Sequence, residues 1–269
     1  MLIRAETLQH WINHFYGYGS WNAPFWFVGY EESGGDLPEE VAEKLNYFYK
    51  VHAPVTEPTL CDIRELYREV VFRIEGPRAK KFANFHDHRF GPDAVLHGFW
   101  KNLIAFKHSF QNKKLPDPLT YQQEKFASSS SQEALIQLYP LPAHSHAWYY
   151  GWLDLPQFPF LKSRASYQQH VYQQRVSGIF NQMKSHKPEL VLMFGMDNII
   201  NLKSSALEFF PSAKFKTMKA VKQVTPQYHV ANCGGTILLI TTQIPGLHHN
   251  RPGTGFDWEQ FGKSVRSSV

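Results

Sequence analysis

Four short, mostly apolar runs along the chain each end in glycine or polar residues. They lie at residues 24–29, 135–140, 190–195 and 237–243. Apolar runs of this length, bounded by turn residues, are typical of strands that are buried on both faces of a parallel sheet. The last of them also belongs to a predicted hairpin over residues 227–242 that turns at residues 232–235.

Segments with helical spacing of apolar residues alternate with these strands. We expect helices at residues 6–16, 38–50, 62–73, 95–108, 165–186, 197–209 and 256–266, and a loop at residues 84–93. This alternation predicts an α/β fold with three α/β/α layers around a central, largely parallel four-stranded sheet. We expect residues 1–269 to form a single domain with an N-terminal helix and a polar insertion near 111–133. The composition of that insertion fits a linker equally well.

The first strand leads directly into a polar, glycine-rich turn. Residues 29–35 read Gly-Tyr-Glu-Glu-Ser-Gly-Gly, and Pro38 then opens a helix. Because the carboxyl ends of parallel strands meet at one edge of a sheet, we expect the strand ends to line one site. A carboxylate held there could orient or activate water, or it could cap a helix or face solvent. Neighbouring side chains diverge, so we assign the functional role to Glu31 rather than to Glu32.

The loop after the last strand, residues 241–253, is the densest polar segment of the chain. It contains Gln243, His248, His249, Asn250 and Arg251. A histidine near a strand end can donate a hydrogen bond to a developing anion, and an arginine can bind phosphate in bidentate fashion. The alternative interpretation is a surface loop with incidental histidines.

Alternate histidines at residues 86–88 and 144–146 raise the question of a metal site. No third ligand stands at a recognised spacing and no paired-cysteine motif is present, so we expect no metal ion. Residues 34–35 are not followed by Gly-Lys-Ser/Thr, and neither a dinucleotide fingerprint nor a Gly-x-Ser-x-Gly elbow occurs. We expect no cofactor.

Composition narrows the class of protein further. The chain is 43% hydrophobic and 15% aromatic, with a net charge of +5. Aromatic residues ordinarily belong to the core, but some could stack on bases or sugars. The positive charge permits salt-sensitive binding to single- or double-stranded DNA, although the lysines could also form an ordinary solvated face. With two distant cysteines, no signal peptide and no long apolar run, we expect a cytoplasmic monomer that does not contact membranes.

The order of these motifs resembles that of the uracil-DNA glycosylase superfamily over residues 24–262. The resemblance rests on Gly-x-carboxylate at residues 29–31, Leu-Tyr-Pro-Leu-Pro at 138–142, Phe-Gly at 194–195 and Pro-Gly-Leu-His-His-Asn at 245–250. The chain departs from the family in two places. The proline expected after Glu31 is missing, and Gln243 stands where the family has the histidine of a His-Pro-Ser motif.

The resemblance implies a divergent enzyme that hydrolyses the N-glycosidic bond of uracil or a related base in DNA. The target nucleotide would leave the base stack and enter the site. Glu31, close to Gly29, would position water or stabilise positive charge on the sugar, and Gln137 would read the edge of the base.

The resemblance also implies an aromatic partner and a hydrogen-bond donor for the base. Phe85 or Tyr30 would stack on the base, and His248 or Gln243 would donate to its carbonyl. Removing one such donor typically costs about 100- to 1,000-fold in rate, so the departure at Gln243 bears directly on activity.

Two rival interpretations remain at the level of sequence. The first is a non-catalytic nucleic-acid-binding or nucleotide-binding protein with the same fold. The second is an unrelated α/β enzyme that acts on a small phosphorylated ligand. Release of a base separates the glycosylase from the first rival, and salt-dependent DNA affinity separates both DNA-directed interpretations from the second.

Overall fold

The structure is a computed structural model that describes residues 3–33, 37–72, 75, 78–143, 148–221, 224–246 and 256–268. The strands in these ranges are β1 (Phe15–Tyr18), β2 (Phe25–Glu31), β3 (Thr59–Cys61), β4 (Glu133–Tyr139), β5 (Leu190–Phe194), β6 (Lys216–Met218), β7 (Tyr228–Cys233) and β8 (Thr236–Ile240). The α-helices are α1 (Ala5–His14), α2 (Pro38–His52), α3 (Ile63–Arg68), α4 (Phe85–Phe90), α5 (Gly98–Phe110), α6 (Pro118–Glu124), α7 (Arg164–His186), α8 (Ile199–Phe209) and α9 (Trp258–Ser268). Two short 3-10 helices, η1 (Tyr149–Trp152) and η2 (Pro159–Lys162), precede α7.

The four predicted strands form the parallel centre of a larger sheet. β2 pairs in parallel with β4 and with β5, and β5 pairs in parallel with β8. The expected four-stranded sheet is corrected, because the sheet has eight strands in the order β3-β1-β4-β2-β5-β8-β7-β6 and is mixed. β1 runs antiparallel to β4, and β6 and β7 continue the other side in antiparallel fashion. The predicted hairpin is confirmed as β7–β8, in which Cys233 pairs with Thr236.

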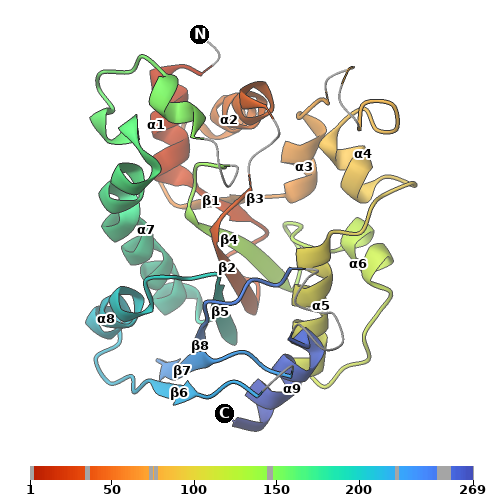
Figure 1. Cartoon of the computed structure of the whole chain (residues 1–269), viewed down its shortest axis with the longest axis vertical. Helices are drawn as coiled ribbons and strands as arrows, with labels where there is room; N and C mark the ends of the chain where they lie inside the picture. The colour runs from red at the N-terminus through yellow and green to blue at the C-terminus, as the bar shows by residue number, and fades with distance from the viewer. Residues whose placement is uncertain are drawn as a thin grey trace.

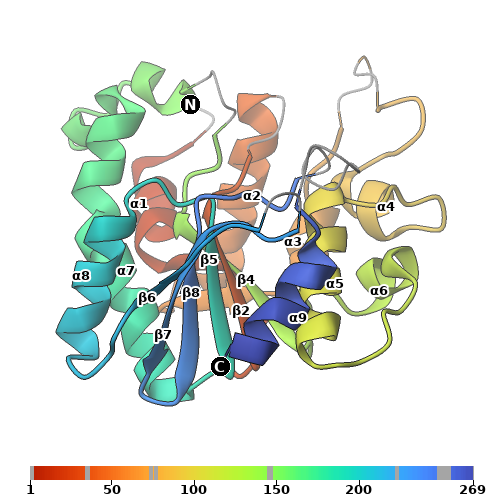
Figure 2. The same cartoon turned by 60° about the horizontal axis from the view of Figure 1, so that its bottom comes forward.

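Helices cover both faces of this sheet (Figure 1). α1, α7 and α8 lie on one side of the strands, and α5 and α9 lie on the other, as the turned view also shows (Figure 2). β2 is buried on both faces because its aromatic side chains alternate between the two layers, and Trp26 faces His186 of α7 with ring centroids 6.5 Å apart. Phe25 contacts Phe110 of α5 with ring centroids 5.9 Å apart, and Phe27 contacts Phe106 of the same helix at 6.3 Å.

The polar segment near 111–133 is packed onto the rest of the fold. It contains α6, and the Arg64 guanidinium of α3 donates hydrogen bonds to the backbone carbonyls of Gln122, Gln123 and Phe126. Next to it, the buried Lys107 ammonium lies 2.7 Å from the Glu133 carboxylate at the start of β4. A buried ion pair with this geometry fixes α5 against β4.

Buried apolar residues from Ile3 near the amino end to Val265 in α9 form one hydrophobic cluster. Among the described residues, every helix is too short or too polar to cross a membrane.

Candidate functional site

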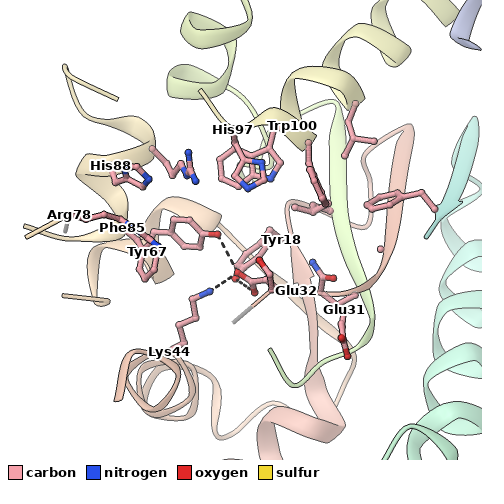
Figure 3. Close-up of a pocket in the computed structure, with 18 residues that line it drawn as sticks. Tyr18, Glu31, Glu32, Lys44, Tyr67, Arg78, Phe85, His88, His97 and Trp100 are labelled. Carbon is pink, nitrogen blue, oxygen red and sulfur yellow. Dashed lines mark hydrogen bonds and ion pairs between the residues drawn. The ribbon is translucent and has the colours of Figure 1, made fainter. Parts of the chain in front are cut away.

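A polar cavity opens at the carboxyl ends of β2 and β4. Its volume is about 580 Å³, and residues of α2, α3, α4 and the first turn of α5 supply its walls (Figure 3). In open α/β sheets, ligands bind in this position, and the volume is in the range of small-molecule sites.

The floor of the cavity is formed by Gly29 and Gln137, which are paired on neighbouring strands. A Cβ atom at position 29 would lie 3.3 Å from the Gln137 Oε1 and 3.1 Å from the Cζ of Phe194. Glycine therefore leaves the Gln137 amide accessible from the cavity. Gln137 is only 4% exposed, and within the described structure its Oε1 has no hydrogen-bond partner. A buried amide oxygen without a partner is costly, so this group is suited to binding a polar ligand.

One corner of the cavity holds a carboxylate in a fixed position. Glu32 accepts hydrogen bonds from the Lys44 ammonium at 2.5 Å, the Tyr18 hydroxyl at 2.9 Å and the Tyr67 hydroxyl at 3.2 Å. Burial and the Glu32 charge raise the pKa of both tyrosines well above the usual value, so both phenols stay protonated and donate. Three donors of this kind fix the position of the Glu32 carboxylate.

Glu31, the carboxylate that we expected to act, is directed elsewhere. Its side chain forms an ion pair with Arg164 and accepts a weak hydrogen bond of 3.4 Å from Gln168, both on α7. Figure 3 shows it pointing away from the group formed by Glu32 and Lys44, although it still borders the cavity. The structure therefore brings Glu32, and not the Glu31 carboxylate, into the cavity corner.

The opposite wall of the cavity is basic and comes from α4 and the turn before it. It presents Arg78, His88 and Arg89. Burial and the nearby arginines lower the pKa of His88 to about 4, and burial, Arg89 and His88 lower the pKa of His97 to about 3. Both imidazoles are therefore neutral at physiological pH.

Aromatic rings line the space between the acidic corner and the basic wall. Phe85 of α4 and Trp100 of α5 face the cavity, so one of the two predicted stacking residues is present there. The His97 ring stacks on Trp100 with centroids 4.5 Å apart and planes inclined by 19°. Trp100 is buried under such stacking, so the partly exposed Phe85 is the ring that suits a planar ligand such as a nucleobase.

The other predicted site residues lie away from the cavity or outside the described residues. The Tyr30 hydroxyl donates weak hydrogen bonds to Gln168 at 3.3 Å and Asp197 at 3.4 Å, on the side of α7. The backbone carbonyl of Gln243, just after β8, accepts a hydrogen bond of 2.9 Å from the backbone amide of Gly195, which is a structural contact. The remaining candidates lie outside the described residues: His248, His249, Asn250 and Arg251.

The α4 part of the cavity wall was missed because residues 84–93 were expected to be a loop. The signal for that helix was Asn84, a residue type that often begins helices. Its side chain accepts a hydrogen bond of 2.8 Å from the Asp87 amide and caps α4. Recognising this cap would have placed His88 and Arg89 on one short helix.

In the described ranges, no three His, Cys, Asp or Glu side chains are arranged to hold a metal ion. Comparison of the chain with protein-family models, curated proteins and solved structures finds no significant match.

Proposed function

We propose that this protein is a divergent DNA glycosylase of the uracil-DNA glycosylase type, which hydrolyses the N-glycosidic bond of uracil or a related base. The observation that carries the proposal is the content of one cavity. The Gln137 Oε1, which is buried and has no hydrogen-bond partner among the described residues, shares this cavity with the Glu32 carboxylate, which is held by three donors. The resemblance to the uracil-DNA glycosylase superfamily also implies that Gln137 recognises the edge of the base.

In this proposal, the floor and the aromatic walls bind the base. The Gln137 amide hydrogen-bonds to its polar edge, and the glycine at position 29 leaves room for that contact. Phe85 and Trp100 supply apolar surface for the ring. The base would leave the duplex stack to reach this site, as enzymes that act on bases require.

Glu32 takes the role that the resemblance first suggested for Glu31. An ionised carboxylate can stabilise positive charge as it develops on the sugar, and it can orient a water molecule. The water oxygen forms a bond to C1′, the C1′–N bond breaks with its electron pair passing to the base, and the proton lost by the water balances the proton gained by the base.

The proposal is tested by single-turnover release of base from a uracil-containing oligonucleotide and from a panel of oligonucleotides with related damaged bases. We expect release by the wild type and a rate at least about tenfold lower for Gln137→Ala, which loses a hydrogen bond to the base. Gln173→Ala, at an exposed position of α7, is the matched control and should release base at the wild-type rate. Absence of release from every substrate by the wild type would contradict the proposal.

One observation favours a second function, which is binding of a nucleotide or nucleic acid without hydrolysis. Both carboxylates at the end of β2 are ion-paired, Glu31 with Arg164 and Glu32 with Lys44. Such pairing fits a protein that binds a nucleotide or nucleic acid without hydrolysing it. Binding of the same oligonucleotides with no base released would favour this alternative.

A further inference from the structure

Lys44 of α2 is a buried amine whose own chemistry the proposed hydrolysis does not use. The residue is 5% exposed, and it is the only lysine among the described residues that line the cavity. Figure 3 shows its side chain extending from α2 toward Glu32. A lysine in such a position can act as a nucleophile once its ammonium has lost a proton to a neighbouring base.

A base that can take this proton is in direct contact with Lys44. The Nζ atom of Lys44 lies 2.5 Å from the Oε1 atom of Glu32. Transfer of one proton between these two atoms converts the ammonium and the carboxylate into a neutral amine and a carboxylic acid. Because both charges disappear in the same transfer, no isolated charge is left in this buried corner.

Aromatic groups cover the amine on one side. The Nζ atom lies 4.9 Å from the ring centroid of Tyr67 and 5.8 Å from that of Phe85, and both rings line the cavity. These rings keep water away from the nitrogen on that side. A site of this kind protects a covalent bond between carbon and nitrogen from premature hydrolysis.

A second buried lysine–glutamate pair provides a contrast. The Lys107 ammonium lies 2.7 Å from the Glu133 carboxylate, and both side chains are at most 2% exposed. Neither residue lines the cavity, so this pair holds α5 on β4 and no ligand reaches it there. Lys44 differs because its amine faces a space of about 580 Å³, which is large enough for a sugar.

We infer that Lys44 forms an imine with the C1′ aldehyde of an abasic deoxyribose, and that the protein cleaves DNA at abasic sites by β-elimination. This activity goes beyond removal of a base, and it rests on the proposed function for bringing C1′ next to Glu32 and Lys44. Loss of a base leaves C1′ as a hemiacetal, which opens to an aldehyde. Aldehydes are the carbonyl groups that lysine amines attack most readily.

The covalent step begins when Lys44 passes a proton to Glu32. The lone pair of Nζ forms a bond to C1′, and the π-electron pair of the carbonyl passes to its oxygen. That oxygen takes one proton from Nζ and one from the Glu32 carboxylic acid, and it leaves as water. The products are an iminium ion on Lys44 and an ionised Glu32.

Strand cleavage follows from the iminium ion, which makes the C2′ hydrogen acidic. The Glu32 carboxylate takes the C2′ proton, and the electron pair of the C2′–H bond forms a double bond between C2′ and C3′. The C3′–O bond breaks, and its electron pair leaves with the phosphate of the next nucleotide. Water then hydrolyses the iminium ion, which returns the ammonium of Lys44 and releases an unsaturated aldehyde.

The test is chemical trapping of the full-length protein on a DNA oligonucleotide in which one abasic site has been prepared beforehand. Sodium cyanoborohydride reduces an iminium ion to a stable amine, so we expect one covalent protein–DNA adduct, which proteolysis and mass spectrometry place on Lys44. Without the reductant, the strand should be cleaved on the 3′ side of the abasic site. An oligonucleotide with a tetrahydrofuran analogue, which cannot open to an aldehyde, should give neither product.

Lys44→Arg keeps a positive charge beside Glu32 but lacks the nucleophilic amine. We expect it to lower both trapping and cleavage at least about 100-fold. Lys50→Gln removes an exposed lysine of the same helix and should trap at the wild-type level. Location of the adduct uses the wild-type protein, so this result does not depend on how well the Lys44 variant folds.

An adduct on Lys44 supports the inference. Absence of any adduct with the wild type would overturn it. So would adducts that are spread over exposed lysines and are formed equally by Lys44→Arg.

This experiment fails independently of the proposed function, because the abasic site is present before the protein is added. An adduct on Lys44, without release of base from any substrate, supports the imine and contradicts the glycosylase. Release of base without an adduct does the opposite.

Discussion

Arg175 of α7 is the side chain whose burial most directly supports the site. It is 0% exposed, and it donates to the backbone carbonyls of Leu138 at 3.1 Å and Gln137 at 2.8 Å. Its guanidinium carbon lies 3.5 Å from the ring centroid of Tyr16. Burial lowers the pKa of Arg175. A single long side chain therefore fixes the end of β4 from the face opposite the cavity.

Replacing Arg175 with methionine keeps most of the volume and removes both hydrogen bonds. We expect Arg175→Met to lower the free energy of unfolding by about 2–4 kcal/mol, because two buried carbonyls lose a charged donor. Urea denaturation measures this change. A loss below about 1 kcal/mol would show that other donors replace the guanidinium.

The sequence was least able to predict which of two adjacent carboxylates, Glu31 or Glu32, faces the cavity. The functional role at the end of β2 was assigned to Glu31 from the sequence, whereas Glu32 is the carboxylate held in the corner of the cavity. That choice depends on Arg164, which lies 133 positions further along the chain and binds Glu31. Contacts between residues so distant in sequence leave no periodic signal.

Secondary-structure elements could be predicted where they are long and apolar. The four central strands were found because each is buried on both faces, whereas β3 and β6 have three residues each and were missed. β1 was assigned in part to the preceding helix, since Phe15 continues the spacing of Leu8 and Trp11. α4 is too polar to show the apolar periodicity of a helix, and its residues were therefore predicted to form a loop.

The packing of α9 on α5 depends on one glycine. A Cβ atom on Gly262 would lie 2.3 Å from the backbone oxygen of Phe106 and 2.2 Å from the Ser109 Oγ. In an exposed helix, Gly→Ala stabilises by about 1 kcal/mol. Here we expect Gly262→Ala to destabilise the protein by about 2 kcal/mol or more, because backbone must move.

The same denaturation experiment provides the control for this prediction. Arg266→Ala alters an exposed position of the same helix and should change stability by less than about 0.5 kcal/mol. A stabilised Gly262→Ala variant would contradict the close approach of the two helices.

At the scale of the whole molecule, several histidines resist protonation in the folded state. Burial lowers the pKa of His10, His14 and His52, and the charge of His14 adds to the effect at His10. The unfolded chain takes up protons at these positions near pH 6.5, before the folded chain does. Their contribution to stability is therefore complete above about pH 6.5 and is lost as the pH falls below it.

His97 should contribute strongly to this acid sensitivity, since its pKa is lowered to about 3. Between pH 7 and pH 5 it alone accounts for a loss of about 2 kcal/mol. We expect the thermal midpoint to fall over this range, and to fall less steeply in His97→Gln. Thermal scans at several pH values measure both slopes. Identical slopes for the two proteins would contradict a neutral, desolvated His97.

We propose that Glu32, held by Tyr18, Lys44 and Tyr67, is the carboxylate that acts on the substrate. The most direct measurement compares two isosteric variants, Glu32→Gln and Glu31→Gln, in single-turnover release of base, with DNA affinity measured in parallel. We expect a rate at least about 100-fold lower for Glu32→Gln, a change of only a few-fold for Glu31→Gln, and nearly unchanged affinity for DNA in both. A large loss confined to Glu31→Gln would contradict it.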